Sequence, residues 1–160
     1  MLFRSQEEVA AELVADLDDA VAAAADATAG ESVFLAVASG GKIDNGAGRI
    51  GRLIEPLSLV DVFTGEELDA DSVHQDSGLA PETVAQLDPD WMIVLDRDAA
   101  TTAGAEAQPA RVLIDAQQAW TDTTFLTQDQ ILVLDAYFYT REGIHAYTEA
   151  FTQIAEAFGA

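Results

Sequence analysis

Three short runs of apolar residues constrain the fold of this chain more than any other feature. They span residues 32–38, 91–95 and 131–134, and they are apolar at nearly every position rather than at every second one. Unbroken runs of this length are typical of strands that are buried on both faces, as in a parallel sheet covered by helices. Segments with helical spacing separate the runs, which predicts βαβ units. The sequence therefore predicts an α/β fold, a three-layer Rossmann-like domain with a mostly parallel sheet flanked by helices.

Capping and breaking residues mark the predicted helices. Ser5 and Glu8 form a capping box before a segment whose apolar residues recur every four positions, and Gly30 is suited to end that helix. Pro81 fits the first turn of a short helix that reaches Leu87. Further helices are expected at about 48–57, 111–120 and 141–158, with a short extended piece at 59–63.

The length of the chain, 160 residues, suits one globular domain with a substantial core. Within it we expect an N-terminal helix over residues 1–30 and the globular part over residues 31–160. A hydrophobic fraction of 49% with only four prolines indicates a folded protein despite the high charge. No apolar stretch reaches the roughly eighteen residues of a membrane span. Residues 1–5 lack the features of a secretion signal.

The charge is strongly acidic, and its few positive residues are unevenly placed. Twenty-nine Asp and Glu residues face only seven Lys and Arg, which gives a net charge of −22. This excludes nucleic acid as a partner, because a phosphate backbone requires a basic surface. Four of the seven cations follow predicted strands: Lys42, Arg49 and Arg52 lie in or after a glycine-rich stretch, and Arg97 follows the second strand. Ligands of α/β sheets bind at the carboxyl ends of strands, so this placement predicts an anion site.

The stretch Gly46–Gly51 matches the pattern G-x-G-x-x-G, which raises the hypothesis of a nucleotide-binding enzyme or regulator. The dinucleotide fingerprint needs its first glycine directly after a strand, whereas seven residues separate Gly46 from the strand end near Ala38. No strand ending in an acidic residue follows about twenty positions later. A weaker prediction remains: a glycine-rich loop that opens a helix, with Arg49 in the first turn, offers amides and a guanidinium to an anion.

The arginines also have a simpler interpretation. Arg49 and Arg52 could pair with local acids such as Asp44 and Glu55, and Arg97 could be balanced by the aspartates on either side of it. Both interpretations stay open at the level of sequence.

Histidines and tyrosines supply the remaining candidates. His74 lies in a polar loop, where it could ligate a metal or simply be solvated, and His145 falls inside the last predicted helix, where a structural role is expected. Tyr137 and Tyr139 follow the third strand and either pack the last helix or direct a phenol at the site. The chain has no cysteine, no Ser-His-Asp arrangement and no paired catalytic carboxylates, so we do not expect an enzyme.

Taken in order, these pieces resemble the C-terminal lobe of the iron-siderophore substrate-binding proteins of bacterial ABC importers. The likeness is strongest to the branch that binds ferric catecholates such as petrobactin, and it covers about residues 30–158. The stretches that carry it are 33–42, 46–51, His74 in its loop, 87–99 with its Asp-Arg-Asp-Ala strand end, and 131–139.

The resemblance implies one lobe of a class III, helix-linked periplasmic-binding-protein fold, with residues 1–30 leading out of a missing first lobe. Arg49 and Arg97 match the two arginines that such a lobe contributes to a ferric-catecholate site, and Lys42 lies at its rim. His74 matches a histidine that ligates iron directly in some members. Its tyrosine partner is either Tyr137 or Tyr139.

The resemblance also implies partners and a location. The ligand would be an Fe(III)-siderophore with no intrinsic cofactor, and the other partners would be an ABC transporter permease and the first lobe. The full-length protein would be extracytoplasmic, either periplasmic or anchored as a lipoprotein. A lobe that binds haem or cobalamin is the alternative within the same fold.

Overall fold

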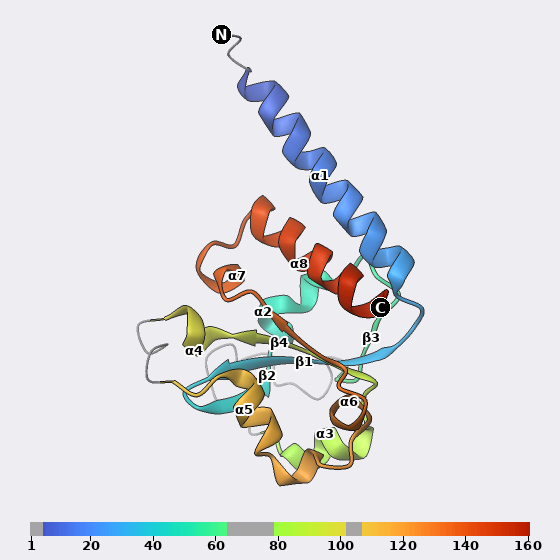
Figure 1. Cartoon of the computed structure of the whole chain (residues 1–160), viewed down its shortest axis with the longest axis vertical. Coiled ribbons are helices and arrows are strands. Elements are labelled where there is room, and N and C mark those ends of the chain that lie inside the picture. The colour runs from blue at the N-terminus through green and yellow to red at the C-terminus, as the bar shows by residue number, and fades with distance from the viewer. Residues whose placement is uncertain (1–4, 64–78, 102–106) are drawn as a thin grey trace.

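In the computed structural model a mostly parallel sheet forms the centre of the molecule (Figure 1). The residues that the structure describes are 5–63, 79–101 and 107–160. The strand order is β2-β1-β4-β5, and β3 pairs with β1 outside this path. Strands β1, β4 and β5 are parallel to one another, as the three apolar runs predicted. The strands are β1 (Ser32–Ser39), β2 (Lys42–Asn45), β3 (Val60–Asp61), β4 (Trp91–Asp96) and β5 (Ile131–Leu134).

Two short strands share the outer edge of β1. The parallel strand β3 pairs with the beginning of β1, where Ser32 lies opposite Val60. The antiparallel strand β2 pairs with its end, where Ser39 lies opposite Lys42. Strand β3 confirms the extended piece expected at 59–63, whereas β2 was not predicted. Gly40 and Gly41 join β1 to β2 with φ values of 60° and 72°, the left-handed conformation that a two-residue hairpin turn requires.

Helices cover both faces of the sheet, which makes three layers (Figure 1). On one face lie α1 (Gln6–Ala27), α2 (Ala47–Ile50), the 3-10 helix η1 (Gly51–Leu53), α7 (Tyr137–Thr140) and α8 (Ile144–Phe158). On the other lie α3 (Pro81–Leu87), α5 (Ala110–Asp115), the 3-10 helix η3 (Gln118–Trp120) and α6 (Thr124–Thr127). The short α4 (Arg97–Ala100) directly follows β4.

The core has two halves because neighbouring strand residues point to opposite faces. In β1, Val33 and Leu35 pack toward α1 and α8, whereas Phe34 and Ala36 pack toward α5 and α6. All four residues are buried, with exposures of at most 1%. Burial on both faces explains why the strand is apolar throughout.

The first helix begins as predicted and then extends away from the sheet. Ser5 Oγ accepts a hydrogen bond from the Glu8 amide at 3.2 Å, and Glu8 Oε2 accepts one from the Ser5 amide at 3.0 Å. Only the second half of α1 is anchored: Ala20 and Ala24 are buried in the core, and the first half protrudes from the body (Figure 1). Among the described residues, none of the helices combines the length and the apolar character needed to cross a membrane.

Three predicted helices are shorter than expected. The segment expected at 48–57 forms only α2 and η1 before the chain turns, since Gly48 and Gly51 favour helix weakly and Pro56 opposes its continuation. The segment expected at 111–120 divides into α5 and η3, and the last helix begins at Ile144 rather than at 141, after the extended residue Gly143. Helix α7 was not predicted. By contrast, α3 begins at Pro81 and ends at Leu87, as expected.

Candidate anion-binding site

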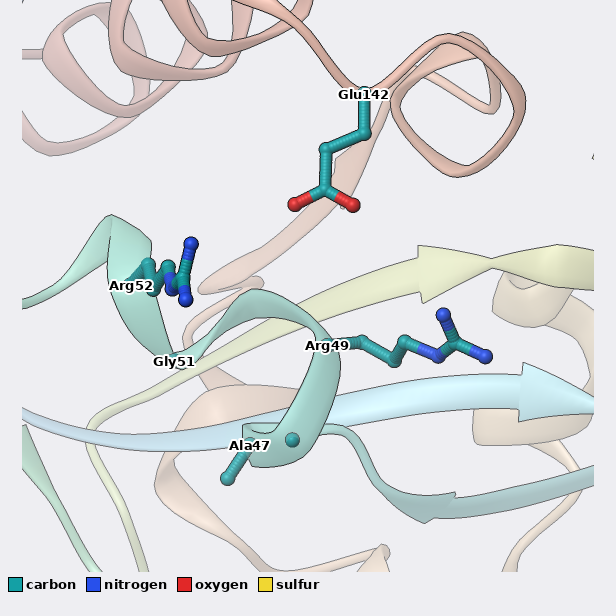
Figure 2. A pocket seen from close by; sticks show the side chains of 6 residues that line it. Ala47, Arg49, Gly51, Arg52 and Glu142 are labelled. Atoms are coloured by element: carbon teal, nitrogen blue, oxygen red, sulfur yellow. The ribbon is translucent and has the colours of Figure 1, made fainter. Parts of the chain in front are cut away.

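The carboxyl ends of three parallel strands meet at one edge of the sheet, and several of the predicted site residues lie there. Arg97 directly follows β4, and two residues separate the end of β5 from the start of α7. Helix α2 starts beside the middle of β1, because the Gly46 amide donates to the Leu35 carbonyl oxygen at 2.8 Å. From there the Arg49 side chain extends along the sheet toward the arrowheads of β1 and β4 (Figure 2). Two arginines that are distant in sequence therefore reach the same place.

Tyr139 lies in contact with both arginines. The Arg97 Nε donates to the Tyr139 hydroxyl at 2.9 Å, and the Arg97 Cζ lies 5.5 Å from the centre of the ring. The Arg49 Cζ lies 5.4 Å from the same ring centre. Both distances are within the range of cation–π attraction. The structure thus brings together Arg49, Arg97 and Tyr139, and it distinguishes between the two tyrosines: Tyr137 is 62% exposed and contacts Arg141 instead.

Ser39 adds a contact that the sequence did not reveal. The Arg97 Nη1 donates to Ser39 Oγ at 2.7 Å, so this guanidinium bridges the end of β1 and helix α7. Both of these partners are hydroxyl groups, and among the described residues no carboxylate forms an ion pair with Arg97. These contacts orient the guanidinium. Its position in the sequence could have indicated this contact, because Ser39 ends an apolar strand and Arg97 follows the neighbouring one.

The aspartates on either side of Arg97 bind backbone amides. Asp96 and Asp98 are buried. Asp96 accepts hydrogen bonds from the Ala99 amide at 3.0 Å and from the Ala110 amide at 2.9 Å. Asp98 accepts one from each of the Gly40 and Gly41 amides, both at 3.0 Å. Both carboxylates are thus directed at backbone amides, and neither forms an ion pair with Arg97 among the described residues.

The glycine-rich stretch serves packing more than anion binding. The Gly40 and Gly41 amides are already occupied by Asp98. Gly46 lies so close to β1 that a Cβ atom there would approach the Ala36 carbonyl to 2.6 Å. The motif that Gly46 begins follows an antiparallel edge strand, not the end of a parallel strand as a dinucleotide fingerprint does. The hypothesis of a dinucleotide site at Gly46–Gly51 therefore has no support in the geometry.

A pocket of about 290 Å³ adjoins the arginines. Its lining residues are Ala47, Gly48, Arg49, Gly51, Arg52 and Glu142 (Figure 2). Between described residues, neither Arg49 nor Arg52 forms an ion pair, whereas Arg111 pairs with both Asp115 and Asp129. The expected pairing of Arg49 and Arg52 with nearby acids is thus not formed within this part of the chain.

Glu142 is the acidic member of the pocket. Its Oε1 accepts a hydrogen bond from the Tyr147 hydroxyl at 2.8 Å. Burial raises the pKa of Tyr147, and the hydrogen bond to Glu142 raises that pKa further, so the phenol stays a donor at neutral pH. Sequence reasoning gave Glu142 no role.

The remaining predicted residues fall in different places. Lys42 is exposed on β2, opposite Ser39. His145 is exposed on α8, and His74 lies outside the described residues. Within the described ranges, no group of three or more His, Asp or Glu side chains is placed to hold a metal ion.

The fold and the candidate site define a class of structure: a three-layer α/β lobe with Arg49 and Arg97 at the carboxyl edge of its sheet. Solved structures match it over nearly the whole chain. A TroA-like periplasmic binding protein from Xylanimonas cellulosilytica is 25% identical, with a TM-score of 0.69 over 94% of this chain and 51% of its own.

Two further solved structures match with lower identity. The petrobactin-binding protein YclQ from Bacillus subtilis is 16% identical, with a TM-score of 0.77 over 97% of this chain and 54% of its own. The triscatecholate siderophore binding protein FeuA, also from Bacillus subtilis, is 14% identical, with a TM-score of 0.68 over 96% and 54%. No family model matches the sequence, and no curated protein does.

This chain therefore has the fold of one lobe of a TroA-like, class III periplasmic binding protein, and it spans about half the length of the solved proteins that it matches. The predicted fold class is confirmed. The structural likeness to siderophore-binding periplasmic proteins is confirmed as well.

Proposed function

We propose that this chain is the C-terminal lobe of an extracytoplasmic substrate-binding protein that captures an anionic ferric siderophore, of the catecholate type, for import by an ABC transporter. The observation that carries the proposal is the convergence of Arg49 and Arg97 on Tyr139. In a chain of net charge −22, two guanidiniums held together by neutral partners form a local site for an anion.

The chemistry of the two arginines suits this ligand. A ferric tris-catecholate is a trianion whose charge is spread over planar rings and their oxygens. A guanidinium presents its donors in a rigid planar fork, and it also stacks on aromatic faces. Arg49 and Arg97 can therefore contact the oxygens and the ring faces of one complex.

Three other residues complete the proposed site. Tyr139 holds the arginines and lies closer to the ligand than Tyr137. Lys42 lies at the rim, where it adds long-range attraction. His74 is proposed as a direct iron ligand when the siderophore leaves coordination positions open, since imidazole is a common iron ligand.

The architecture is part of the proposal. The exposed first half of α1 leads from a first lobe that would form the opposite wall of the cleft. Binding sites commonly bury about 70–90% of a ligand, so one wall alone should bind weakly. The complete protein would deliver its ligand to an ABC transporter permease, and it would be periplasmic or anchored outside the membrane as a lipoprotein.

A direct titration tests the function. The probe is the ferric complex of a synthetic hexadentate tris-catecholamide, a trianion, added to the lobe while tryptophan fluorescence is recorded. We expect saturable quenching, and we expect Arg49→Ala and Arg97→Ala each to weaken binding about tenfold, as the loss of a hydrogen bond to a charged group implies. Arg111→Ala, which removes a cation that pairs with Asp115 and Asp129, is the matched control.

The alternatives give different results. If the double variant Arg49→Ala/Arg97→Ala binds the chelate as well as the parent, the proposed site is wrong. If the parent ignores the chelate but binds haem or cobalamin, the fold serves another ligand. If calorimetry detects binding of NAD or ATP instead, the nucleotide hypothesis returns.

A further inference from the structure

A carboxylate stands beside the proposed anion site, where it opposes the binding of a simple anion. Glu142 lines the same pocket as Arg49 and Arg52. Figure 2 shows its carboxylate pointing into the space between the two arginine side chains. A negative charge at such a place repels an anionic ligand. Its presence therefore needs a reason other than the attraction of a trianion.

The orientation of Glu142 is fixed by the core. Its Oε1 accepts the hydroxyl hydrogen of Tyr147 at 2.8 Å. The Tyr147 ring packs edge-on against Phe138 at 5.1 Å and near Phe151 at 6.5 Å, both of which are buried. Within the described residues, the carboxylate forms no ion pair with either arginine of the pocket. Glu142 is thus held at the pocket by the fold, and its negative charge is not neutralised by a pocket arginine.

We propose that this pocket is a subsite for a cationic amine on the siderophore and that Glu142 is a specificity residue. The inference rests on the proposed function. Arg49 borders both the pocket and Tyr139, so a ligand bound between the arginines can extend an arm into the pocket. A volume of about 290 Å³ lies at the lower end for ligand sites, which suits a short alkylammonium arm rather than a whole chelate.

Glu142 is proposed to select between ligands through its opposite effects on two kinds of chelate. For a chelate with an amine arm, Glu142 supplies a charge-assisted hydrogen bond. For a chelate without one, Glu142 contributes only repulsion. Specificity is a difference between two affinities, and a repulsive group contributes to it as much as an attractive one does. The lobe should therefore prefer an anionic ferric chelate that carries a positive charge next to its metal centre.

The test uses a matched pair of probes. One is the ferric tris-catecholamide with a primary amine on a short arm. The other is the same chelate with that amine acetylated, which removes the positive charge and keeps the arm. For Glu142→Gln we expect the affinity for the amine chelate to fall about three- to tenfold, and the affinity for the acetylated chelate to rise about twofold. A fall in affinity for the amine chelate together with a rise for the acetylated chelate would indicate the subsite.

Two further variants sharpen the result. Glu149→Gln removes a carboxylate from the exposed surface of α8 and should change neither affinity measurably. Arg52→Ala should weaken the acetylated chelate more than the amine chelate, because Arg52 attracts their shared anionic part but repels the ammonium in the pocket that it lines. Thermal melts must first show that each variant is folded, which the near-identical shape of Gln and Glu favours.

The outcomes separate the two proposals. If the parent binds both chelates and Glu142→Gln changes both affinities in the same direction, or neither, the amine subsite is wrong and the proposed function stands. If the parent binds neither chelate, the proposed function is wrong and the subsite with it. Opposite changes with an unaffected Glu149→Gln support the inference.

Discussion

The Arg97 guanidinium donates to the Tyr139 hydroxyl at 2.9 Å, and its Cζ lies 5.5 Å from the centre of the same ring. The tyrosine therefore contacts the arginine through both its hydroxyl and its aromatic ring. The contact fixes the direction of the guanidinium, and in the proposed site the charge of this guanidinium is available to a ligand.

The hydroxyl and the ring of Tyr139 make separable contributions. For Tyr139→Phe we expect about a threefold to tenfold loss of affinity for the ferric tris-catecholamide, the value of one ordinary hydrogen bond, because the variant loses a bond that orients Arg97 and no bond to the ligand itself. Tyr139→Ala should lose more, because the ring contacts to Arg49 and Arg97 vanish as well. Tyr137→Phe is the control and should bind as the parent does. Equal affinities for Tyr139→Phe and Tyr137→Phe in a fluorescence titration would contradict the assignment.

The salt dependence of binding should follow the two arginines. Exposed charges are screened as ionic strength rises, so the affinity of the parent for the trianionic chelate should fall between 50 mM and 500 mM NaCl. In Arg49→Ala/Arg97→Ala this slope should be much shallower. Trp91 and Trp120 report the titration; Trp91 begins β4 and lies about 20 Å from Arg97 along the strand. Parallel slopes for parent and variant would show that the attraction comes from elsewhere.

Gly46 and Gly48 should respond oppositely to alanine. A Cβ at Gly46 would meet the Ala36 carbonyl at 2.6 Å, so Gly46→Ala should cost about 1–3 kcal/mol in the free energy of unfolding. Nothing lies within 4 Å of a Cβ at Gly48, which is helical, so Gly48→Ala should be neutral or stabilising by up to about 1 kcal/mol. Urea denaturation of both variants measures the difference. A harmless Gly46→Ala would refute the close approach of α2 to β1.

The hairpin turn depends on a distant carboxylate. Asp98→Ala would leave the Gly40 and Gly41 amides without their partner and should destabilise the lobe by about 2–4 kcal/mol. The variant should also bind the ferric chelate less well, because Arg97 is the neighbour of Asp98. Asp115→Ala is a fitting control, since it removes an exposed carboxylate that pairs with Arg111 on the other face of the sheet. If both variants are equally stable and bind equally well, the turn does not need Asp98.

The raised pKa of Asp61 leads to a prediction about how the stability of the protein depends on pH. Burial raises the pKa of Asp61, and the hydrogen bond from the Phe63 amide lowers it by less. A carboxyl group whose pKa is higher in the folded protein binds protons more tightly there, so its contribution to stability falls as pH rises above about 3.8. Asp61→Asn should therefore be more stable than the parent at pH 7, and this advantage should shrink toward pH 3. Chemical denaturation at the two pH values measures it; an advantage that grows on acidification would contradict the raised pKa.

Much of the fold could be predicted because it depends on local patterns. The apolar runs of β1, β4 and β5 carry their own signal, as do the capping box of Ser5 and the proline that begins α3. The hairpin strand β2 could not be predicted in this way. Its turn is held by Asp98, which lies 57 and 58 residues further along the chain, and no local pattern reveals such a partner.

The site was predictable in part for the same reason. Arg49 and Arg97 stand out because cations are scarce and follow strands. The choice between Tyr137 and Tyr139 depends on how the short helix α7 is rotated, which packing decides. Ser39 and Glu142 were missed because a serine at a strand end and an acid in an acidic chain are unremarkable until their neighbours are known.

The bond between Asp98 and the Gly40–Gly41 turn has a consequence for selectivity. Two successive glycine amides in left-handed conformation are a typical cradle for phosphate or another small oxyanion. Here the carboxylate of Asp98 occupies the cradle. Because this carboxylate is part of the chain, its effective concentration at the cradle is always high. Free phosphate and nucleotides, abundant competitors for any cationic site, are thereby denied one of the contacts that they would otherwise use. In the proposed site, recognition of the anion is then left to the arginines, whose planar guanidinium groups can also stack on aromatic rings of a ligand.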